Sequence, residues 1–464
     1  MSDPIADGEI STATGPMETL PSPAPAKAGR RRGGSFASNI KWQLVGSLSQ
    51  AFLGGVVLLL MGRELGAAGF GVYSIIMGVV YLANALVEPR MQDVAAKQFW
   101  NLQADDVDLP EQNRYFLDLL ALETLGKLLP CVAVIGLAHV LTAVSNLPPG
   151  SPDLFVVAAA GYYLSKFGYG LSTGLLRVLG RSDLFALCTT GEVLIRFALM
   201  VGIVLTSSLS VEACIWIVAM SGVASNGLQW WLLRRHMPMK FRSEGWTVRG
   251  AARRTRLNMR LLVSNLGMSL TDLMNKDLDV TLISTLLPAA QVGIYKMAKN
   301  ITLLAWRAID PFYIALMPEI SRMVAQAEFS KLSRLIARTS AALFGLALFL
   351  SVAAYVSLLL FGDVILGPAF TDTAHLLPWM MVGIVLSAPL VWGHPLAVAL
   401  NCADVAFLGS LLGAVVGLAA FMGLVPLYGV RGASLAWVVS FVLSFVSIAL
   451  ITHGRLRQRV RVAA

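Results

Sequence analysis

Long apolar segments alternate with short breaks of polar, Gly or Pro residues along most of the chain. The apolar segments lie at residues 40–62, 70–89, 116–143, 154–178, 183–206, 211–233, 259–286, 289–317, 335–361, 374–400, 404–425 and 430–452. A helix needs about 20 apolar residues to cross the hydrocarbon core of a bilayer. The pattern therefore predicts an all-α polytopic membrane protein with about 12 transmembrane helices.

Basic residues are distributed unequally between the two sides of these predicted helices. With the N-terminus inside, and with residues at helix ends counted in the adjoining break or tail, the tails and the breaks after even-numbered helices hold 27 of the 36 Lys and Arg residues, whereas the opposite breaks hold two, Arg63 and Arg431. The other seven lie within predicted helices. Because cytoplasmic loops carry the excess of Lys and Arg, we expect both termini in the cytoplasm. The net charge of +9 then reflects topology, not binding of nucleic acid.

The same pattern predicts five regions. They are a disordered basic cytoplasmic tail at 1–37, an N-lobe with helices 1–6 at 38–233, a basic cytoplasmic linker at 234–258, a C-lobe with helices 7–12 at 259–452 and a basic cytoplasmic tail at 453–464. The first tail is rich in Pro, Ala, Ser and Gly and has nothing to form a core. The basic linker is expected to face anionic lipid, with a partner-docking role as the alternative.

Two stretches of the chain resemble each other at a shift of 222 residues. Residues 65–73 (LGAAGFGVY) align with 287–295 (LPAAQVGIY), and the same shift aligns Glu88-Pro89 with Asp310-Pro311 and Gln50 with Asp272. Because six predicted helices separate the copies, both halves enter the membrane from the same side. This predicts two six-helix lobes related by a parallel pseudo-twofold repeat. Repeats of this kind build transporters whose site lies between the halves.

The amino-acid composition and motifs exclude several functional classes. Only 14% of the residues are charged and 56% are apolar, whereas about 25% of the residues of a soluble protein are charged, so a soluble enzyme is excluded. No Walker-type phosphate loop and no region of ATPase size occur, so the energy must come from an ion gradient, from substrate gradients or from a partner; a proton or sodium gradient is the candidate coupling. The five His and four Cys form no metal motif. We expect no enzyme activity and no bound cofactor.

Polar residues recur inside several predicted helices, where ionisable groups are costly and usually face the bundle interior. In helix seven, one face carries Asn265, Ser269, Asp272, Lys276 and Asp279. Their steps of four and three residues place them together. Asp272 lies near the middle of the helix at ion-pair spacing from Lys276. We take Asp272 and Asp279 as candidates for ion coupling, with a static ion pair between Asp272 and Lys276 as the alternative.

Two further helices present mainly cationic faces. Helix eight carries Lys296, Lys299, Asn300, Arg307 and Asp310, and helix four carries Tyr162, Lys166, Tyr169, Thr173 and Arg177. These faces predict a binding site for an anionic substrate formed by Lys166, Arg177, Lys296, Lys299 and Arg307. The alternative for each Lys is a tertiary ion pair with an acid on another helix.

Two predicted helices each contain an acidic and a basic residue four positions apart. Glu123 precedes Lys127 in helix three, and Glu192 precedes Arg196 in helix five. Such a pair can neutralise itself and hold a bundle together, so a structural role competes with a functional one. If the Glu192–Arg196 pair is functional, Glu192 is a third candidate for ion coupling beside Asp272 and Asp279.

Several segments resemble a known family. The resemblance rests on Asn39-x-x-Trp42, Gly62-Arg63-x-Leu65-Gly66-Ala-Ala-Gly-Phe70-Gly71-x-Tyr73, Asp279-x(13)-Gly293-x-Tyr295-x-x-Ala298 and Leu360-Phe361-Gly362. In order and spacing these segments resemble polysaccharide (Wzx-type) flippases of the multidrug/oligosaccharidyl-lipid/polysaccharide exporter superfamily. The likeness spans about residues 38–452.

The resemblance implies a function. It implies two lobes around a central cavity and export of an undecaprenyl-pyrophosphate-linked oligosaccharide across the bacterial inner membrane, for lipopolysaccharide O-antigen or exopolysaccharide synthesis. Expected partners are the lipid-linked oligosaccharide, membrane lipids, and a polysaccharide polymerase and glycosyltransferases.

Two alternative functions remain. A cation-coupled drug or small-solute antiporter of the same superfamily would favour an acid-rich, aromatic-lined cavity. A membrane-embedded glycosyltransferase would favour a large outer loop with a catalytic acid or His.

Overall fold

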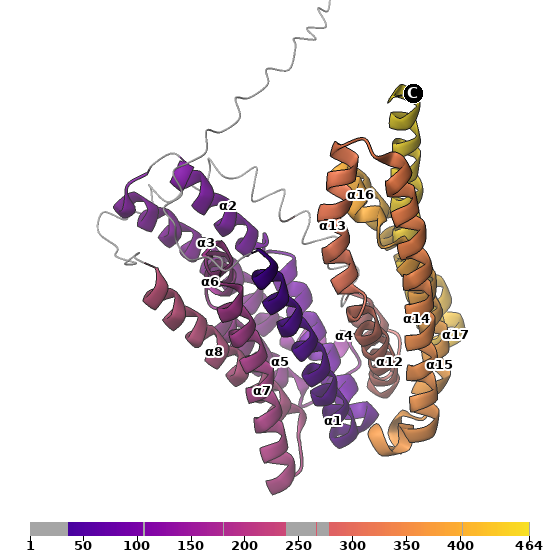
Figure 1. Cartoon of the computed structure of the whole chain (residues 1–464). Coiled ribbons are helices and arrows are strands. Elements are labelled where there is room, and N and C mark those ends of the chain that lie inside the picture. The colour runs from indigo at the N-terminus through magenta and orange to yellow at the C-terminus, as the bar shows by residue number, and fades with distance from the viewer. Residues whose placement is uncertain are drawn as a thin grey trace, which may run out of the picture. The chain divides into compact units, whose positions relative to one another are not determined.

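The computed structural model describes residues 36–104, 107–179, 181–237, 266, 278–400 and 402–463. Within these ranges every regular element is helical (Figure 1). The α-helices are α1 (Phe36–Ala85), α2 (Met91–Ala104), α3 (Leu109–Gly136), α4 (Ala138–Val144), α5 (Ser151–Ser165), α6 (Tyr169–Val178), α7 (Ser182–Thr206), α8 (Val211–His236), α11 (Leu278–Ser284), α12 (Ala289–Arg307), α13 (Asp310–Ala325), α14 (Phe329–Ile365), α15 (Thr373–Ser387), α16 (Gly393–Ala399) and α17 (Ala403–Ala463). Two 3₁₀-helices, η1 (Pro368–Phe370) and η2 (Ala388–Leu390), complete the set.

Seven of the described helices are long and apolar enough to cross a membrane. Two of them, α1 and α17, each contain two predicted spans joined at a glycine with a positive φ, Gly66 at 64° and Gly429 at 56°. Glycine adopts this backbone region without steric cost. The remaining predicted spans correspond to the broken pair α5–α6, the polar helix α12, and the seventh helix, of which the described part is mainly α11. The all-helical fold with about 12 spans is confirmed.

Some boundaries differ from the prediction. Helix α2 occupies 91–104, where the hydropathy pattern indicates only a polar connection, and α13 is a separate helix where one helix at 289–317 is predicted. Pro311 lies in the first turn of α13, a position that suits proline because its missing N–H would have no partner there. The C-terminal basic segment continues α17 to Ala463. Residues 1–35 and most of the linker lie outside the described residues.

The repeat predicted from the sequence is visible in the packing. Helix α2 packs on α6 in the first half, and α13 packs on α16 in the second. Both α6 and α16 follow a break in a membrane-crossing segment, at residues 166–168 and 388–392. At Gly174 of α6, an added Cβ would lie only 2.5 Å from the Gln92 carbonyl oxygen, so glycine permits this close contact. The two halves meet chiefly where α1 packs along α12.

Candidate functional site

A cavity of about 540 Å³ lies between elements of the two halves. Its walls come from α1 and α7 and the α5–α6 break of the first half, and from α12 and α14 of the second. The described lining residues are Gln50, Ala51, Gly54, Gly55, Leu58, Leu59, Lys166, Tyr169, Thr189, Glu192, Val193, Arg196, Asn300, Ile301, Leu303, Leu304, Arg307, Ala354, Ser357, Leu358, Ile365 and Leu366. A cavity built from both repeats agrees with the location that the repeat predicts.

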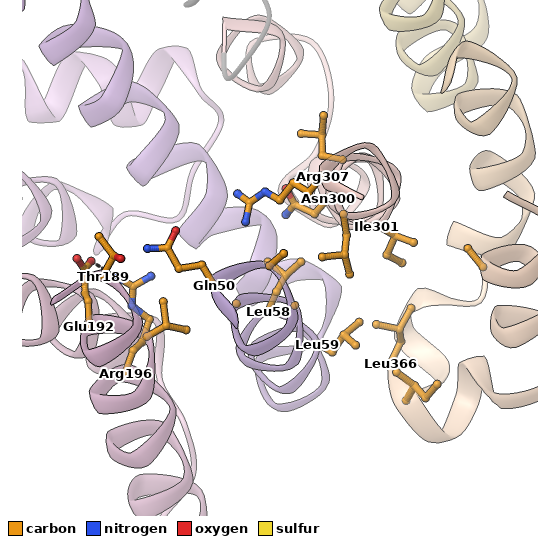
Figure 2. A pocket seen from close by; sticks show the side chains of 18 of the residues that line it. Gln50, Leu58, Leu59, Thr189, Glu192, Arg196, Asn300, Ile301, Arg307 and Leu366 are labelled. Carbon is orange, nitrogen blue, oxygen red and sulfur yellow. Dashed lines mark hydrogen bonds and ion pairs between the residues drawn. The ribbon is translucent and has the colours of Figure 1, made fainter. Parts of the chain in front are cut away.

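Polar and apolar lining residues occupy different parts of the cavity. Figure 2 shows Gln50, Glu192 and Arg196 on one wall and Asn300 and Arg307 on the other, with leucines of α1 and the end of α14 between and below them. The charged lining residues are Lys166, Glu192, Arg196 and Arg307. Three cations and one carboxylate give the described lining a formal charge of +3 − 1 = +2.

Glu192 and Arg196 neutralise each other on α7. Arg196 donates to the Glu192 carboxylate at 2.7 Å and to the Ser221 hydroxyl of α8 at 3.3 Å. Both side chains are partly accessible, at 15% for Glu192 and 23% for Arg196. The excess positive charge of the cavity therefore resides on Lys166 and Arg307. Among the described residues, neither of these two forms a salt bridge.

Lys166 is placed by a break in the fourth membrane-crossing segment. Helix α5 ends at Ser165, α6 begins at Tyr169, and Gly168 between them has a φ of 60°. The Lys166 ammonium lies over the Tyr169 ring, 4.0 Å from its centroid, which is a favourable cation–π distance. Both side chains face the cavity.

Glu123 and Lys127 of α3 satisfy the backbone groups that this break frees. Lys127 Nζ donates to the Lys166 carbonyl at 2.8 Å, and the Glu123 carboxylate accepts from the N–H groups of Gly170 at 2.8 Å and Leu171 at 3.0 Å. The two side chains are buried and 2.5 Å apart. A broken helix at membrane depth needs such internal partners because lipid supplies none. This pair therefore supports the structural interpretation.

Asn226 of α8 also binds the backbone at the break. Its Nδ2 donates to the Phe167 carbonyl at 2.7 Å. The carbonyls of two successive loop residues are thus bound by side chains from α3 and α8. The position of the Lys166 side chain depends on these two helices as well as on its own segment.

Lys299 lies outside the cavity, in a buried ion pair. Its Nζ is 2.6 Å from Asp279 Oδ2, and the Tyr295 hydroxyl donates to the same oxygen at 2.5 Å. Lys299 is 0% exposed and Asp279 is 4% exposed. This is the tertiary pairing that the sequence leaves open as an alternative to substrate binding. At the shift of 222, the corresponding first-half residues are Val57, Tyr73 and Met77, so the ion pair occurs in the second half alone.

The other predicted site residues lie elsewhere. Arg177 is exposed at the end of α6, with its guanidinium 5.3 Å from the centroid of the Phe185 ring. Lys296 is half-buried on α12 and is absent from the described cavity lining. Asp272, together with Lys276, lies outside the described residues. The structure therefore brings Lys166, Arg307 and Glu192 to one cavity and leaves Arg177, Lys296, Lys299 and Asp279 outside its described lining.

The sequence does not indicate which residues of α14 line the cavity. Helix α14 contributes Ala354, Ser357, Leu358 and Ile365. Residues 341–362 of this helix are almost all apolar, so neither charge nor periodicity distinguishes the lining residues from residues that face lipid. Gln50 of α1, by contrast, is the repeat counterpart of Asp272, and that correspondence marks it as a candidate lining residue.

The fold and the cavity define a polytopic membrane protein with two repeated helix groups around a cavity that carries both charged and apolar side chains. The family model described as "Polysaccharide biosynthesis protein" matches residues 36–324, more than half of the chain. The chain belongs to this family. No curated protein sequence matches it.

Solved structures support the same fold. An inward-facing multidrug resistance MATE family transporter of the MOP superfamily has 16% identity and a TM-score of 0.68, covering 91% of this chain and 96% of that one. The lipid II flippase MurJ in an inward closed conformation has 12% identity and a TM-score of 0.65, with 87% of each chain covered. An outward-facing MATE transporter has 16% identity and a TM-score of 0.53, covering 91% and 95%. At these identities the likeness establishes the fold alone.

Proposed function

We propose that the protein is a flippase that moves an undecaprenyl-pyrophosphate-linked oligosaccharide from the cytoplasmic to the periplasmic leaflet of a bacterial inner membrane. The observation that carries this proposal is the excess of positive charge in the cavity, with Lys166 and Arg307 on opposite repeats and without salt-bridge partners among the described residues. The pathway served is O-antigen or exopolysaccharide synthesis, with the polymerase and glycosyltransferases as partners.

The chemistry of such a substrate matches the cavity. Its pyrophosphate is anionic, its sugars are polar, and its polyprenyl chain can remain in lipid. Burying an unpaired phosphate charge in hydrocarbon is prohibitive, whereas Arg and Lys beside a polar cavity supply charge-assisted hydrogen bonds. Gln50 and Asn300 add neutral donors and acceptors for hydroxyl groups. Membership in a polysaccharide biosynthesis family and the fold shared with a lipid II flippase support this choice.

Rocking of one half against the other would expose the cavity to the two leaflets in turn. In this mechanism both cations bind the pyrophosphate while the polyprenyl chain stays outside the polar region. The proposed topology places both termini and the basic linker in the cytoplasm. A proton or sodium gradient drives the cycle. Glu192 is the coupling candidate within the described cavity, and Asp272 and Asp279 of the seventh helix remain candidates.

The drug-antiporter alternative fits the described lining less well. It calls for several acids and aromatic rings, but the described lining contains a single acid, Glu192, and a single aromatic residue, Tyr169. The glycosyltransferase alternative calls for a large outer loop. The segment between α14 and α15 is short and contains η1, which leaves no room for a catalytic domain there.

A reconstituted transport assay tests the proposal. Purified protein in vesicles is given a fluorescent pyrophosphate-linked oligosaccharide, and its protection from an external quencher is followed over time. The wild type is expected to move this lipid and to leave a cationic dye in place. Arg307→Gln should slow the movement about tenfold, the cost of one charge-assisted hydrogen bond. Arg338→Gln, which changes an exposed side chain of α14, is the matched control. Transport of the dye with no movement of the lipid would overturn the proposal in favour of the antiporter.

A further inference from the structure

A second cavity lies in the C-terminal half, away from the one described above. It has a volume of about 360 Å³ and is lined by His375, Trp379, Tyr428, Arg431 and Leu435. None of these residues lines the central cavity. His375 is in the first turn of α15, and Arg431 follows the Gly429 bend of α17. The two helices pack against each other (Figure 1).

Arg431 is unusual for its position. It is one of two Lys or Arg residues in or directly beside the breaks opposite the basic linker, where cationic residues are disfavoured. The other, Arg63, donates to the Val364 carbonyl at 2.7 Å and so has a structural partner. In the part of the chain that the structure describes, Arg431 has neither a hydrogen-bond partner nor an ion-pair partner. Its exposed guanidinium is available for an external anion.

Aromatic rings flank this arginine. Trp379 is 56% exposed and Tyr428 is 61% exposed. Amphipathic rings of this kind concentrate at the level of lipid headgroups. His375 adds a ring nitrogen that can donate to a phosphate oxygen. The cavity thus combines a guanidinium, an imidazole and two aromatic rings at one end of the helix pair.

The helix surfaces that continue from this cavity are apolar. On α15, Trp379 is followed by the exposed Val382 and Leu386 at steps of three and four. On α17, Arg431 is followed by Leu435 and the exposed Val439 at steps of four. These spacings place each set on one helical face. The groove therefore has a charged and aromatic end and two apolar stripes. This arrangement suits an amphiphile with a charged head group and apolar chains.

We propose that the groove between α15 and α17 binds an anionic glycerophospholipid, with its phosphate at Arg431 and His375 and its acyl chains along the two apolar stripes. Arg pairs with phosphate through two parallel N–H donors. The apolar stripes select a membrane lipid over a free phosphate compound. The site is separate from the proposed transport path.

Photolabelling tests the site directly. The full-length protein is placed in phosphatidylcholine vesicles doped with phosphatidylglycerol that carries a diazirine in one acyl chain, and labelled peptides are mapped after irradiation. Label is expected on 379–386 and 431–439. Arg431→Gln should reduce it at least tenfold, because the charge-assisted pair with the phosphate is lost and one such hydrogen bond alone accounts for about tenfold. Arg457→Gln, at an exposed residue near the other end of α17, should leave it unchanged. Equal labelling of the Arg431→Gln variant would overturn the proposal.

Two further measurements keep the test decisive. Trp379→Ser changes an exposed ring, so it should retain the fold while lowering the label on both peptides; unchanged label would contradict the site. Unlabelled phosphatidylglycerol should compete with the probe, whereas glycerol phosphate, which has the head and no chains, should not. Equal competition by glycerol phosphate would overturn the lipid assignment in favour of a free phosphate. Because the readout is binding at α15 and α17, it is independent of whether the central cavity transports oligosaccharide.

Discussion

Gly71 of α1 and Gly293 of α12 lie against each other's helix at the contact between the two halves. A Cβ on Gly71 would lie 1.8 Å from the Ala289 carbonyl oxygen, and a Cβ on Gly293 would lie 2.1 Å from the Ala67 carbonyl oxygen. The shift of 222 residues converts Ala67 into Ala289 and Gly71 into Gly293. The contact is therefore reciprocal, as expected for residues beside a pseudo-twofold axis.

Small residues at this crossing let two backbones approach closely, as they do in many membrane helix pairs. Gly71→Ala and Gly293→Ala should each reduce the free energy of unfolding by about 1–3 kcal/mol, the usual cost of overpacking. The measurement is thermal or denaturant unfolding of the purified protein in detergent. Gly227→Ala, at a glycine of α8 with open space around its added Cβ, is the matched control. A loss of stability no larger than that of this control would contradict the account of the crossing.

Substitutions of Glu123 and Lys127, which bind the backbone at the α5–α6 break, should have strongly coupled effects on the free energy of unfolding. Lys127→Met leaves the buried Glu123 carboxylate without its cation and should cost about 3–5 kcal/mol. Adding Glu123→Gln should recover part of that loss, because the uncompensated charge is gone and the Gln carbonyl can still accept one N–H of α6. Unfolding of the two single variants and the double variant measures the coupling. Strictly additive losses would rule out the pair as the support of the break.

Substitutions of Asp279 and Lys299 test whether this buried pair is static or takes part in ion coupling. Asp279→Asn or Lys299→Met alone should destabilise the protein by about 3–5 kcal/mol, because the other charge remains buried. Combining both changes should restore much of the stability and, if the pair is static, transport as well. A double variant that is stable but inactive would instead assign Asp279 a role in ion coupling. Both quantities come from the same purified variants.

The proposed topology follows from the charge bias. Reporter fusions placed after His236 and after Arg457 should indicate the cytoplasm, and a fusion after Pro149 should indicate the periplasm. The physical reason is the 27 to 2 distribution of Lys and Arg between the two sets of breaks. A periplasmic signal at His236 would require an odd number of spans before the linker and would contradict the two-lobe topology.

Hydropathy was sufficient to predict most of the fold because each long apolar segment can satisfy its backbone only as a helix. The repeat was also visible in the sequence, and the Gly71–Gly293 contact gives it a structural counterpart. The break between α5 and α6 was not predicted. Gly168 alone is a weak signal, and the groups that stabilise the break, Glu123 and Lys127, are distant in sequence. Such tertiary support is invisible to local pattern analysis.

The candidate site was predicted in part. Lys166 and Arg307 face the cavity, whereas Lys299 pairs with Asp279. A helical period places Lys299, Asn300 and Arg307 on one broad face, but it does not tell which edge of that face meets α11 and which meets the cavity. That division depends on how α12 is rotated against its neighbours, which is determined by tertiary packing.

We expect Lys166 and Arg307 to bind the pyrophosphate of the lipid that the proposed flippase transports. The most direct measurement compares transport of one oligosaccharide on a pyrophosphate-linked and on a monophosphate-linked polyprenol, in the wild type and in the Lys166→Gln/Arg307→Gln variant. We expect the wild type to prefer the pyrophosphate form by about tenfold and the variant to lose this preference, because each charged contact is worth about 1.5–3 kcal/mol. An undiminished preference in the variant, with Arg338→Gln behaving as wild type, would contradict the claim.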